Sequence, residues 1–176
     1  MKATGIVRRI DDLGRVVIPK EIRRTMRIRE GDPLEIFTSN GEVIFKKYSP
    51  IGELSPTAVQ YAEAMIKHTT SPVIICDRDH CIAVGGGLKK NLLEKAVSSD
   101  LEKICEERKT FINRENKEIF ALDGVNKKIC TAVPVIAAGD IIGCVVLLEN
   151  ETSTAATEHD VKLAEVASRF LSSRSE

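Results

Sequence analysis

Residues 5–48 read GIVRRIDDLGRVVIPKEIRRTMRIREGDPLEIFTSNGEVIFKKY, and this stretch sets the architecture of the first third of a 176-residue chain. Within it, Asn40-Gly41 lies between two runs rich in β-branched and aromatic residues, 34–38 and 42–48. Both central residues of a type I′ turn need a positive φ, which Asn and Gly tolerate best. The spacing therefore predicts a two-residue β-hairpin.

Upstream of the hairpin, the sequence predicts two further strands and a short helix. Residues 4–10 and 15–18 are rich in β-branched side chains and flank a turn at 11–14. Pro19 suits the first position of a helix, because its φ is already helical and its missing N–H has no partner there. The predicted order is strand, strand, helix, strand, strand.

This part of the chain is too small to bury a core of its own. About 50 residues with one short helix cover little apolar surface, and the region has no cysteine to supply a disulfide or a metal site. It nevertheless holds sixteen apolar positions between Ile6 and Phe45. We therefore predict an obligate dimer in which strands of two chains share one core.

The net charge of zero, from 26 basic and 26 acidic residues, hides an asymmetry. Residues 1–47 carry eleven Lys and Arg against seven Asp and Glu, and the remainder carries the opposite excess. Seven of the eight bases between Arg8 and Arg29 are Arg, whose planar guanidinium suits phosphates and guanine edges. The shortage of aromatic residues disfavours single strands. This pattern predicts double-stranded DNA as a partner, with a solvated basic surface as the alternative.

Residues 1–50 resemble the DNA-binding domain of the AbrB-like family of bacterial transition-state regulators. The LGRVVIP segment at 13–19 and the Arg23-Arg24 pair carry this resemblance. It implies an intertwined swapped-hairpin dimer that contacts DNA through Arg8, Arg15, Arg23 and Arg24, with Arg9, Lys20 and Arg27 as secondary candidates. Related domains also occur in antitoxins of toxin–antitoxin pairs, so an antitoxin function stays open.

The remainder of the chain predicts a second domain over residues 57–176. Turn formers in SPIGELSP at 49–56 predict a linker at 51–56 that separates this domain from the DNA-binding domain at 1–50. Periodicity predicts helices at 55–68 and 157–171, strands at 72–76, 81–84 and 118–122, and a hairpin of 129–136 with 141–148. Helices at both ends of a mostly antiparallel sheet give an α+β fold class.

The segment AVPVIAAGDIIGCVVLLEN at 132–150 resembles GAF sensory domains. This resemblance implies a small-molecule site of unknown ligand between the sheet and its helices. Gly85-Gly86-Gly87 before a predicted helix is either an anion-binding loop or a plain turn. The AbrB-like and GAF-like domains together resemble a family of transcription regulators that activate and repress sporulation genes in the forespore. We expect the two end helices of the second domain to join dimers into a tetramer.

Cys76-x-x-x-x-Cys81, with His80 between them, invites a metal or redox interpretation. The sequence has no Cys-x-x-Cys and no second ligand pair, so buried thiols are the preferred interpretation and we predict no metal and no cofactor. Free methionine sulfoxide reductase, an enzyme of the GAF fold, uses cysteines, which keeps a thiol enzyme as a less favoured alternative. No catalytic constellation is visible, and we predict that the protein is not an enzyme.

The sequence also predicts a cytoplasmic location. No apolar run approaches the ~20 residues that a membrane span needs, and the N-terminal residues lack the apolar core of a signal peptide.

Overall fold

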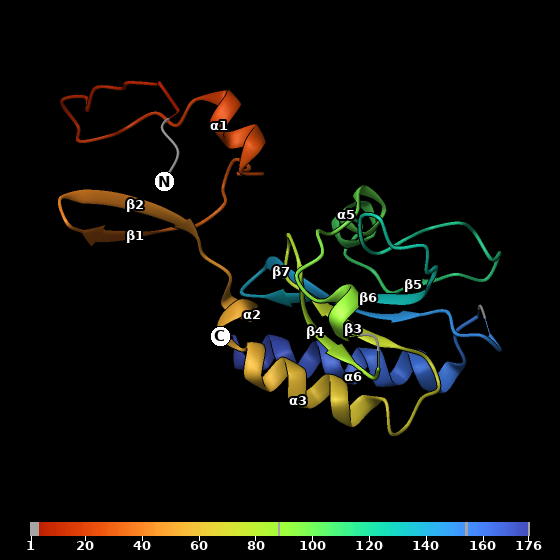
Figure 1. The fold of residues 1–176 in the computed structure, drawn as a ribbon. Coiled ribbons are helices and arrows are strands. Elements are labelled where there is room, and N and C mark those ends of the chain that lie inside the picture. Colours follow the sequence, from red (N-terminus) through yellow and green to blue (C-terminus); the bar gives the residue numbers. More distant parts are fainter. Residues whose placement is uncertain (1–3, 88, 154, 176) are drawn as a thin grey trace. The chain divides into compact units, whose positions relative to one another are not determined.

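The computed structural model describes residues 4–87, 89–153 and 155–175, and the chain divides into two compact units (Figure 1). We call Met1–Tyr48 the head unit and Ser49–Glu176 the body unit. Over the described ranges, no helix combines the length and apolarity needed to cross a bilayer.

The head unit contains one short helix and one hairpin. Helix α1 spans Lys20–Thr25, strand β1 spans Leu34–Ser39 and strand β2 spans Glu42–Lys47, with the two strands antiparallel. Asn40 and Gly41 adopt φ values of 49° and 79°, as a type I′ turn requires. The predicted two-residue hairpin is confirmed.

The strands predicted at 4–10 and 15–18 are not formed in this single chain. The turn between them does form: the N–H of Gly14 donates to the carbonyl of Asp11 at 3.0 Å, and the N–H of Asp11 donates to the carbonyl of Arg15 at 3.1 Å. Beyond this turn, the two segments have no partner strand within the described head unit. Without a ladder of hydrogen bonds, an extended segment is not a strand.

The head unit lacks a core of its own. None of residues 4–48 is fully buried. Of fourteen large apolar side chains that are exposed in the described chain, twelve lie in this unit: Ile6, Val7, Ile10, Leu13, Val16, Val17, Met26, Ile36, Phe37, Val43, Phe45 and Tyr48. Folded domains rarely leave so much apolar surface uncovered.

One face of the β1–β2 hairpin is apolar and uncovered. Cross-strand pairing places Ile36 opposite Phe45 and Thr38 opposite Val43 on this face. Ile36, Val43 and Phe45 are 61%, 61% and 43% exposed. Cross-strand neighbours of this kind normally pack against a second layer, and the described head unit offers none.

The linker predicted at 51–56 is instead helical and belongs to the body unit. Helix α2 spans Pro50–Glu53 and helix α3 spans Ser55–Met65. The hydroxyl of Ser49 caps α2 by accepting from the N–H of Gly52 at 3.1 Å. The prediction failed because the turn-forming residues Ser, Pro and Gly here serve as cap and first turn, while Ile51 is fully buried in the body core.

The body unit is built on a five-stranded antiparallel sheet of order β4-β3-β7-β6-β5. Its strands are β3 (Val73–Cys76), β4 (Cys81–Gly85), β5 (Phe111–Ile112), β6 (Ile129–Ala137) and β7 (Asp140–Leu148). The predicted hairpin and the strands near 72–76 and 81–84 are confirmed. The strand predicted at 118–122 is reduced to isolated bridges at Phe120 and Leu122.

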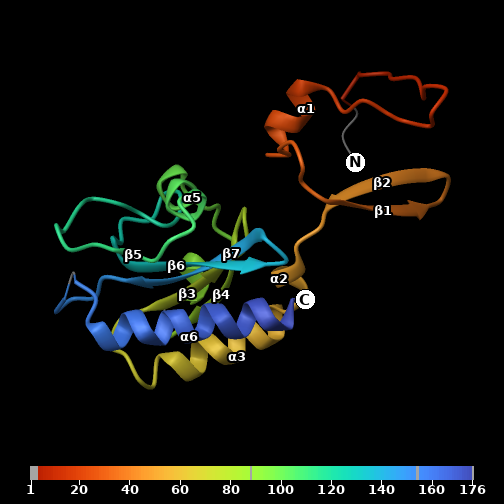
Figure 2. The same ribbon diagram turned by 180° about the vertical axis from the view of Figure 1, so that it is seen from behind.

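Helices cover both faces of this sheet. Helix α3 and helix α6 (Glu158–Arg174) lie side by side on one face, and helix α5 (Ser99–Glu106) lies on the other with the short α4 (Lys89–Leu92) (Figure 2). Each face has its own apolar core, one with α3 and α6 and one with α5. At Gly85 an added Cβ would lie 2.3 Å from the carbonyl oxygen of Ala62, so this glycine lets β4 approach α3.

Candidate nucleic-acid interface

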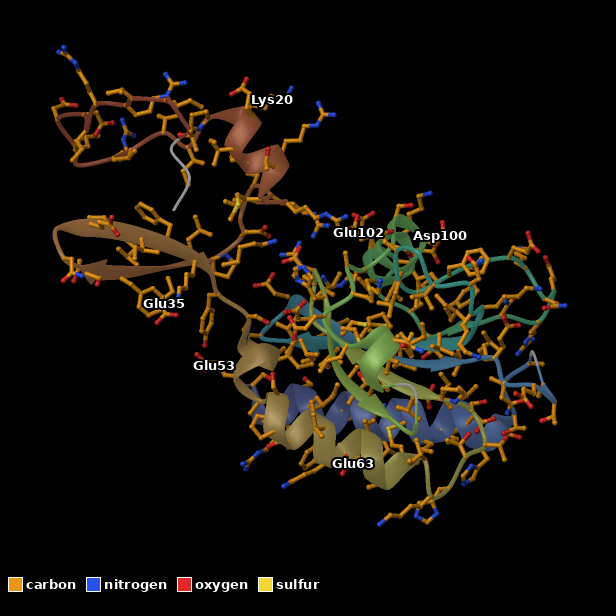
Figure 3. The ribbon with its side chains drawn as sticks, viewed as in Figure 1. Lys20, Glu35, Glu53, Glu63, Asp100 and Glu102 are labelled. Carbon is orange, nitrogen blue, oxygen red and sulfur yellow. The ribbon has the colours of Figure 1, made fainter. Side chains whose placement is uncertain are left out.

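The structure leaves all seven predicted DNA-contacting side chains exposed. Arg8 and Arg9 precede the turn at 11–14, and Arg15 follows it. Lys20 opens α1 and points away from the chain (Figure 3). Arg23, Arg24 and Arg27 lie in or just after the same helix. Both figures of the fold place the 4–18 segment and α1 on one side of the head unit and the hairpin on the other (Figures 1 and 2).

Helix α1 is too short to be stable by itself and is held at both ends. Pro19 accepts from the N–H of Arg23 at 2.9 Å, and the carbonyl of Arg23 accepts from the N–H of Ile28 at 2.7 Å. The ammonium of Lys47 on β2 donates to the carbonyl of Arg27 at 2.8 Å. These contacts fix the backbone that carries the Arg23-Arg24 pair.

The side chain of Lys47 has a structural role in the head unit. Its ammonium lies 3.6 Å from the Asp32 carboxylate, whose side chain is almost fully buried. The same carboxylate accepts from the N–H of Arg29 at 2.8 Å. Lys47 contributes to the basic charge of residues 1–47, and its hydrogen bond to the carbonyl of Arg27 ties β2 to the end of α1.

Asp11 is the residue of this surface that sequence reasoning missed. Its Oδ2 accepts from Nε of Arg15 at 2.7 Å, and the two side chains are 34% and 69% exposed. Hydrogen bonds from the backbone and side chain of Arg15 hold the pKa of Asp11 below its usual range, so the pair is ionic at neutral pH. The spacing of Asp and Arg across a D-x-x-G-R turn was the available signal.

Four of the five cysteines of the body unit are buried, and Cys105 is partly buried. All five are free thiols. Cys76 pairs across the sheet with Cys81 on β4 and with Cys144 on β7, and Cys105 of α5 packs against the same core. Among the described residues, no group of three or more His, Cys, Asp and Glu side chains is placed to hold a metal ion.

These surroundings raise the pKa of three of the thiols, Cys76, Cys130 and Cys144. A hydrogen bond with the Cys81 thiol and burial raise the pKa of Cys76 well above its ordinary value. Burial and a hydrogen bond with Cys105 do the same to the pKa of Cys144. Burial raises the pKa of Cys130 to about 11. Since the thiolate is the reactive form, these cysteines are poor nucleophiles at neutral pH.

In the folded protein, we therefore expect iodoacetamide to modify Cys105, which is partly exposed, well before the buried Cys76, Cys130 and Cys144. Mass spectrometry of timed samples measures the order. Rapid labelling of Cys76 in the folded state would contradict its assignment as a buried thiol with a raised pKa.

The raised pKa of Cys130 also predicts that the free energy of unfolding falls as pH rises from 9.0 to about 11, because the thiol ionises at a lower pH in the unfolded chain than in the folded one.

The described body unit also holds a shallow groove of about 260 Å³ between β6 and α6. Pro134, Ile136, Ser168, Arg169, Ser172 and Ser173 line it. The hydroxyl of Ser168 donates to the carbonyl of Pro134 at 2.7 Å, and that of Ser172 donates to the carbonyl of Ile136. These hydroxyls satisfy carbonyls of β6, so they support the fold.

The Gly85-Gly86-Gly87 anion loop depends on Leu88 and on the Lys89 and Lys90 side chains, which lie outside the described residues.

Two protein-family models match the chain, one over most of each unit. Residues 53–176 match the family described as stage V sporulation protein T C-terminal, transcription factor. Residues 7–52 match the family described as antidote-toxin recognition MazE, bacterial antitoxin.

Individual relatives extend these matches. The chain is 50% identical to stage V sporulation protein T of Bacillus subtilis (strain 168) over 100% of this chain and 99% of the relative. It is 60% identical over 50 residues to transition state regulatory protein AbrB of the same organism, covering 28% of this chain and 52% of that relative. The AbrB-like resemblance of the first 50 residues is thereby confirmed.

A solved structure shares the fold of the body unit. Type II free methionine-R-sulfoxide reductase from Thermoplasma acidophilum superposes with a TM-score of 0.52 at 11% identity, over 71% of this chain and 94% of that one. At this identity the similarity concerns the fold alone. The predicted α+β class and the GAF-like architecture of the second domain are confirmed.

Proposed function

Because the chain belongs to the family of stage V sporulation protein T transcription factors, we propose that it activates and represses sporulation-stage genes by gripping double-stranded DNA with paired head units. The observation that carries this proposal is an AbrB-like unit on which all seven predicted contact residues are exposed. We further propose that this activity takes place in the cytoplasm of the forespore, and the similarity to stage V sporulation protein T supports this location.

The proposed DNA-binding species is a dimer of interlocked head units. The twelve exposed apolar side chains of the head unit need a cover, and the segments 4–10 and 15–18 need partner strands. A second copy of the head unit supplies both an apolar surface and partner strands, since its own apolar side chains are uncovered and its own segments 4–10 and 15–18 are unpaired. Two copies also double the arginines and align them along one duplex, with Arg8, Arg15, Arg23 and Arg24 as the principal contacts and Arg9, Lys20 and Arg27 as secondary ones.

Salt dependence tests DNA binding through these arginines. If all four principal arginines on each of two chains reach phosphates, they make eight contacts, and log K should fall against log salt with a slope of about −7. If Arg15 contacts a base edge instead, six phosphate contacts give a slope of about −5. Fluorescence anisotropy of a labelled duplex between about 50 and 200 mM salt measures the slope. A slope near zero would exclude an arginine–phosphate interface.

We further propose that body units associate through α3 and α6 and so link two dimers into a tetramer. The rings of Tyr61 on α3 and Phe170 on α6 stack with centroids 4.9 Å apart. Val166 and Phe170 remain 57% and 37% exposed on α6. An aromatic and aliphatic patch across two adjacent helices suits pairing with the same patch on another copy.

Substituting Val166 by Glu is expected to convert tetramers to dimers, because a carboxylate placed twice in a symmetric apolar contact lacks a partner. Sedimentation velocity of the full chain measures the change. Ser99→Glu is the matched control: it adds the same charge at an exposed position at the start of α5, on the other face of the sheet. An unchanged tetramer in Val166→Glu would exclude this face.

A regulatory signal, if the GAF-like body unit receives one, would act by changing how body units pack. Such a change alters the spacing or orientation of the head dimers on DNA. In the described body unit, the hydroxyls of Ser168 and Ser172 in the groove at β6 and α6 already donate to backbone carbonyls.

A second candidate function follows from the match of residues 7–52 to an antitoxin family. An antitoxin would copurify with a tightly bound toxin protein from its own organism. Purification of the native complex decides between the two functions, and a chain that elutes only with itself and DNA excludes the antitoxin.

We propose no catalytic activity for the body unit. The buried thiols have raised pKa values, which opposes nucleophilic chemistry at neutral pH. Assaying free methionine sulfoxide with the protein and a thiol reductant tests this, and turnover that disappears in Cys76→Ser would establish an enzyme instead.

A further inference from the structure

We propose that Asp11 is a positioning residue for DNA recognition: its carboxylate holds Arg15 by Nε and so presents the two terminal nitrogens of the guanidinium to the duplex. The inference rests on the proposed function and deepens it, because it states how one of the principal arginines is oriented.

The carboxylate of Asp11 is itself fixed by the turn that it closes. Its Oδ1 accepts from the N–H of Leu13 at 3.0 Å and from the N–H of Arg15 at 2.7 Å. Gly14 adopts a φ of 75°, which only a residue without Cβ adopts readily. Two backbone hydrogen bonds therefore make the carboxylate a rigid anchor, whereas a surface counter-ion is usually mobile.

The second carboxylate oxygen then orients the guanidinium. Oδ2 accepts from Nε of Arg15 at 2.7 Å, so the contact occupies the inner donor of the group. A guanidinium has five N–H donors, and the four on its terminal nitrogens remain. A guanine edge accepts two parallel donors of this kind, and such a contact depends on the DNA sequence, which a phosphate contact does not. The exposure of the Arg15 side chain, 69%, leaves that outer end accessible.

Charge alone predicts the opposite role for Asp11. Its pKa is held below the ordinary value by the hydrogen bonds from Arg15, so it stays negative near a polyanion and repels it. Asp12 carries the same charge at the next position and is exposed. Removing charge should strengthen binding to every duplex, whereas removing orientation should weaken binding to the preferred duplex only. The two effects have different signatures.

The test compares Asp11→Asn with Asp12→Asn in the full chain. Asn at 11 retains an oxygen for the backbone N–H groups of Leu13 and Arg15 but turns an NH2 donor toward Nε, which breaks the guanidinium contact. The probes are a duplex that the wild type enriches from a random-sequence library and a scrambled duplex of the same composition. We expect the ratio of the two affinities to fall about tenfold in Asp11→Asn and to stay unchanged in Asp12→Asn.

Two further measurements separate positioning from folding. In an Arg15→Ala background, Asp11→Asn should leave the affinity ratio unchanged, because nothing remains to be oriented. Without DNA, the Nε–H signal of Arg15 in nitrogen-15 NMR should be protected from exchange in the wild type and in Asp12→Asn, and should lose that protection in Asp11→Asn.

The outcomes distinguish this inference from the function on which it rests. Equal affinity ratios for the two single variants, or a further tenfold loss on adding Asp11→Asn to Arg15→Ala, would overturn the role of Asp11 alone. A wild-type chain that enriches no duplex would overturn the proposed function, and the role of Asp11 with it.

Discussion

Replacing Arg23 and Arg24 together by alanine is expected to lower the affinity for duplex DNA by at least about a hundredfold, since each arginine contact contributes about 1–3 kcal/mol. In the proposed dimer the double substitution removes four guanidinium groups. Both residues lie on α1, whose backbone is held by hydrogen bonds to Pro19 and Ile28, so the loss should be one of contacts and not of structure. The salt slope should fall by about 4 as well.

The matched control removes the same charge from the body unit. Lys109 and Arg114 are exposed there, and Lys109→Ala with Arg114→Ala lowers the net charge of the chain equally. Anisotropy titrations should find DNA binding by this control close to the wild type. Equal losses in the two double variants would mean that net charge, and not the α1 surface, governs binding.

The local structure of the head unit was largely predictable because it depends on neighbours in sequence. The Asn40-Gly41 turn and the two strands beside it follow from the φ values that each residue tolerates. The segments at 4–10 and 15–18 have equally clear strand composition, yet they are not strands in the single chain. A ladder needs a partner, and composition does not say in which molecule the partner lies.

The errors in the body unit have a tertiary cause. Residues 51–56 carry the Pro, Ser and Gly of a linker, but the burial of Ile51 makes this segment part of the core. The position of Cys144 beside Cys76 was likewise not predicted, because the register between β3 and β7 brings together residues far apart in sequence.

In the candidate DNA surface, too, some features were predictable from composition and others depend on tertiary contacts. Composition alone predicts the Arg-rich segment, whereas the roles of Asp11 and Lys47 depend on hydrogen bonds to particular backbone atoms. Counting charges in the sequence includes both residues but assigns neither of them a structural role. Geometry separates the bases that remain exposed from the base that holds the unit together.

Substituting Ile36 by Asp is expected to abolish the folded dimer of head units and DNA binding with it. In the single chain Ile36 is 61% exposed, and a polar substitution at such a site usually changes stability by no more than about 0.5 kcal/mol. Within a shared core the same carboxylate is buried without a partner in both copies, at a cost of several kcal/mol each.

Asn40→Asp is the control, because it adds the same charge to the hairpin turn, where Asp tolerates the positive φ of 49°. Sedimentation velocity and thermal unfolding of the full chain measure both variants. If Ile36→Asp keeps the oligomeric size and melting profile of Asn40→Asp, the apolar face of β1 and β2 stays in water and the interlocked dimer is wrong.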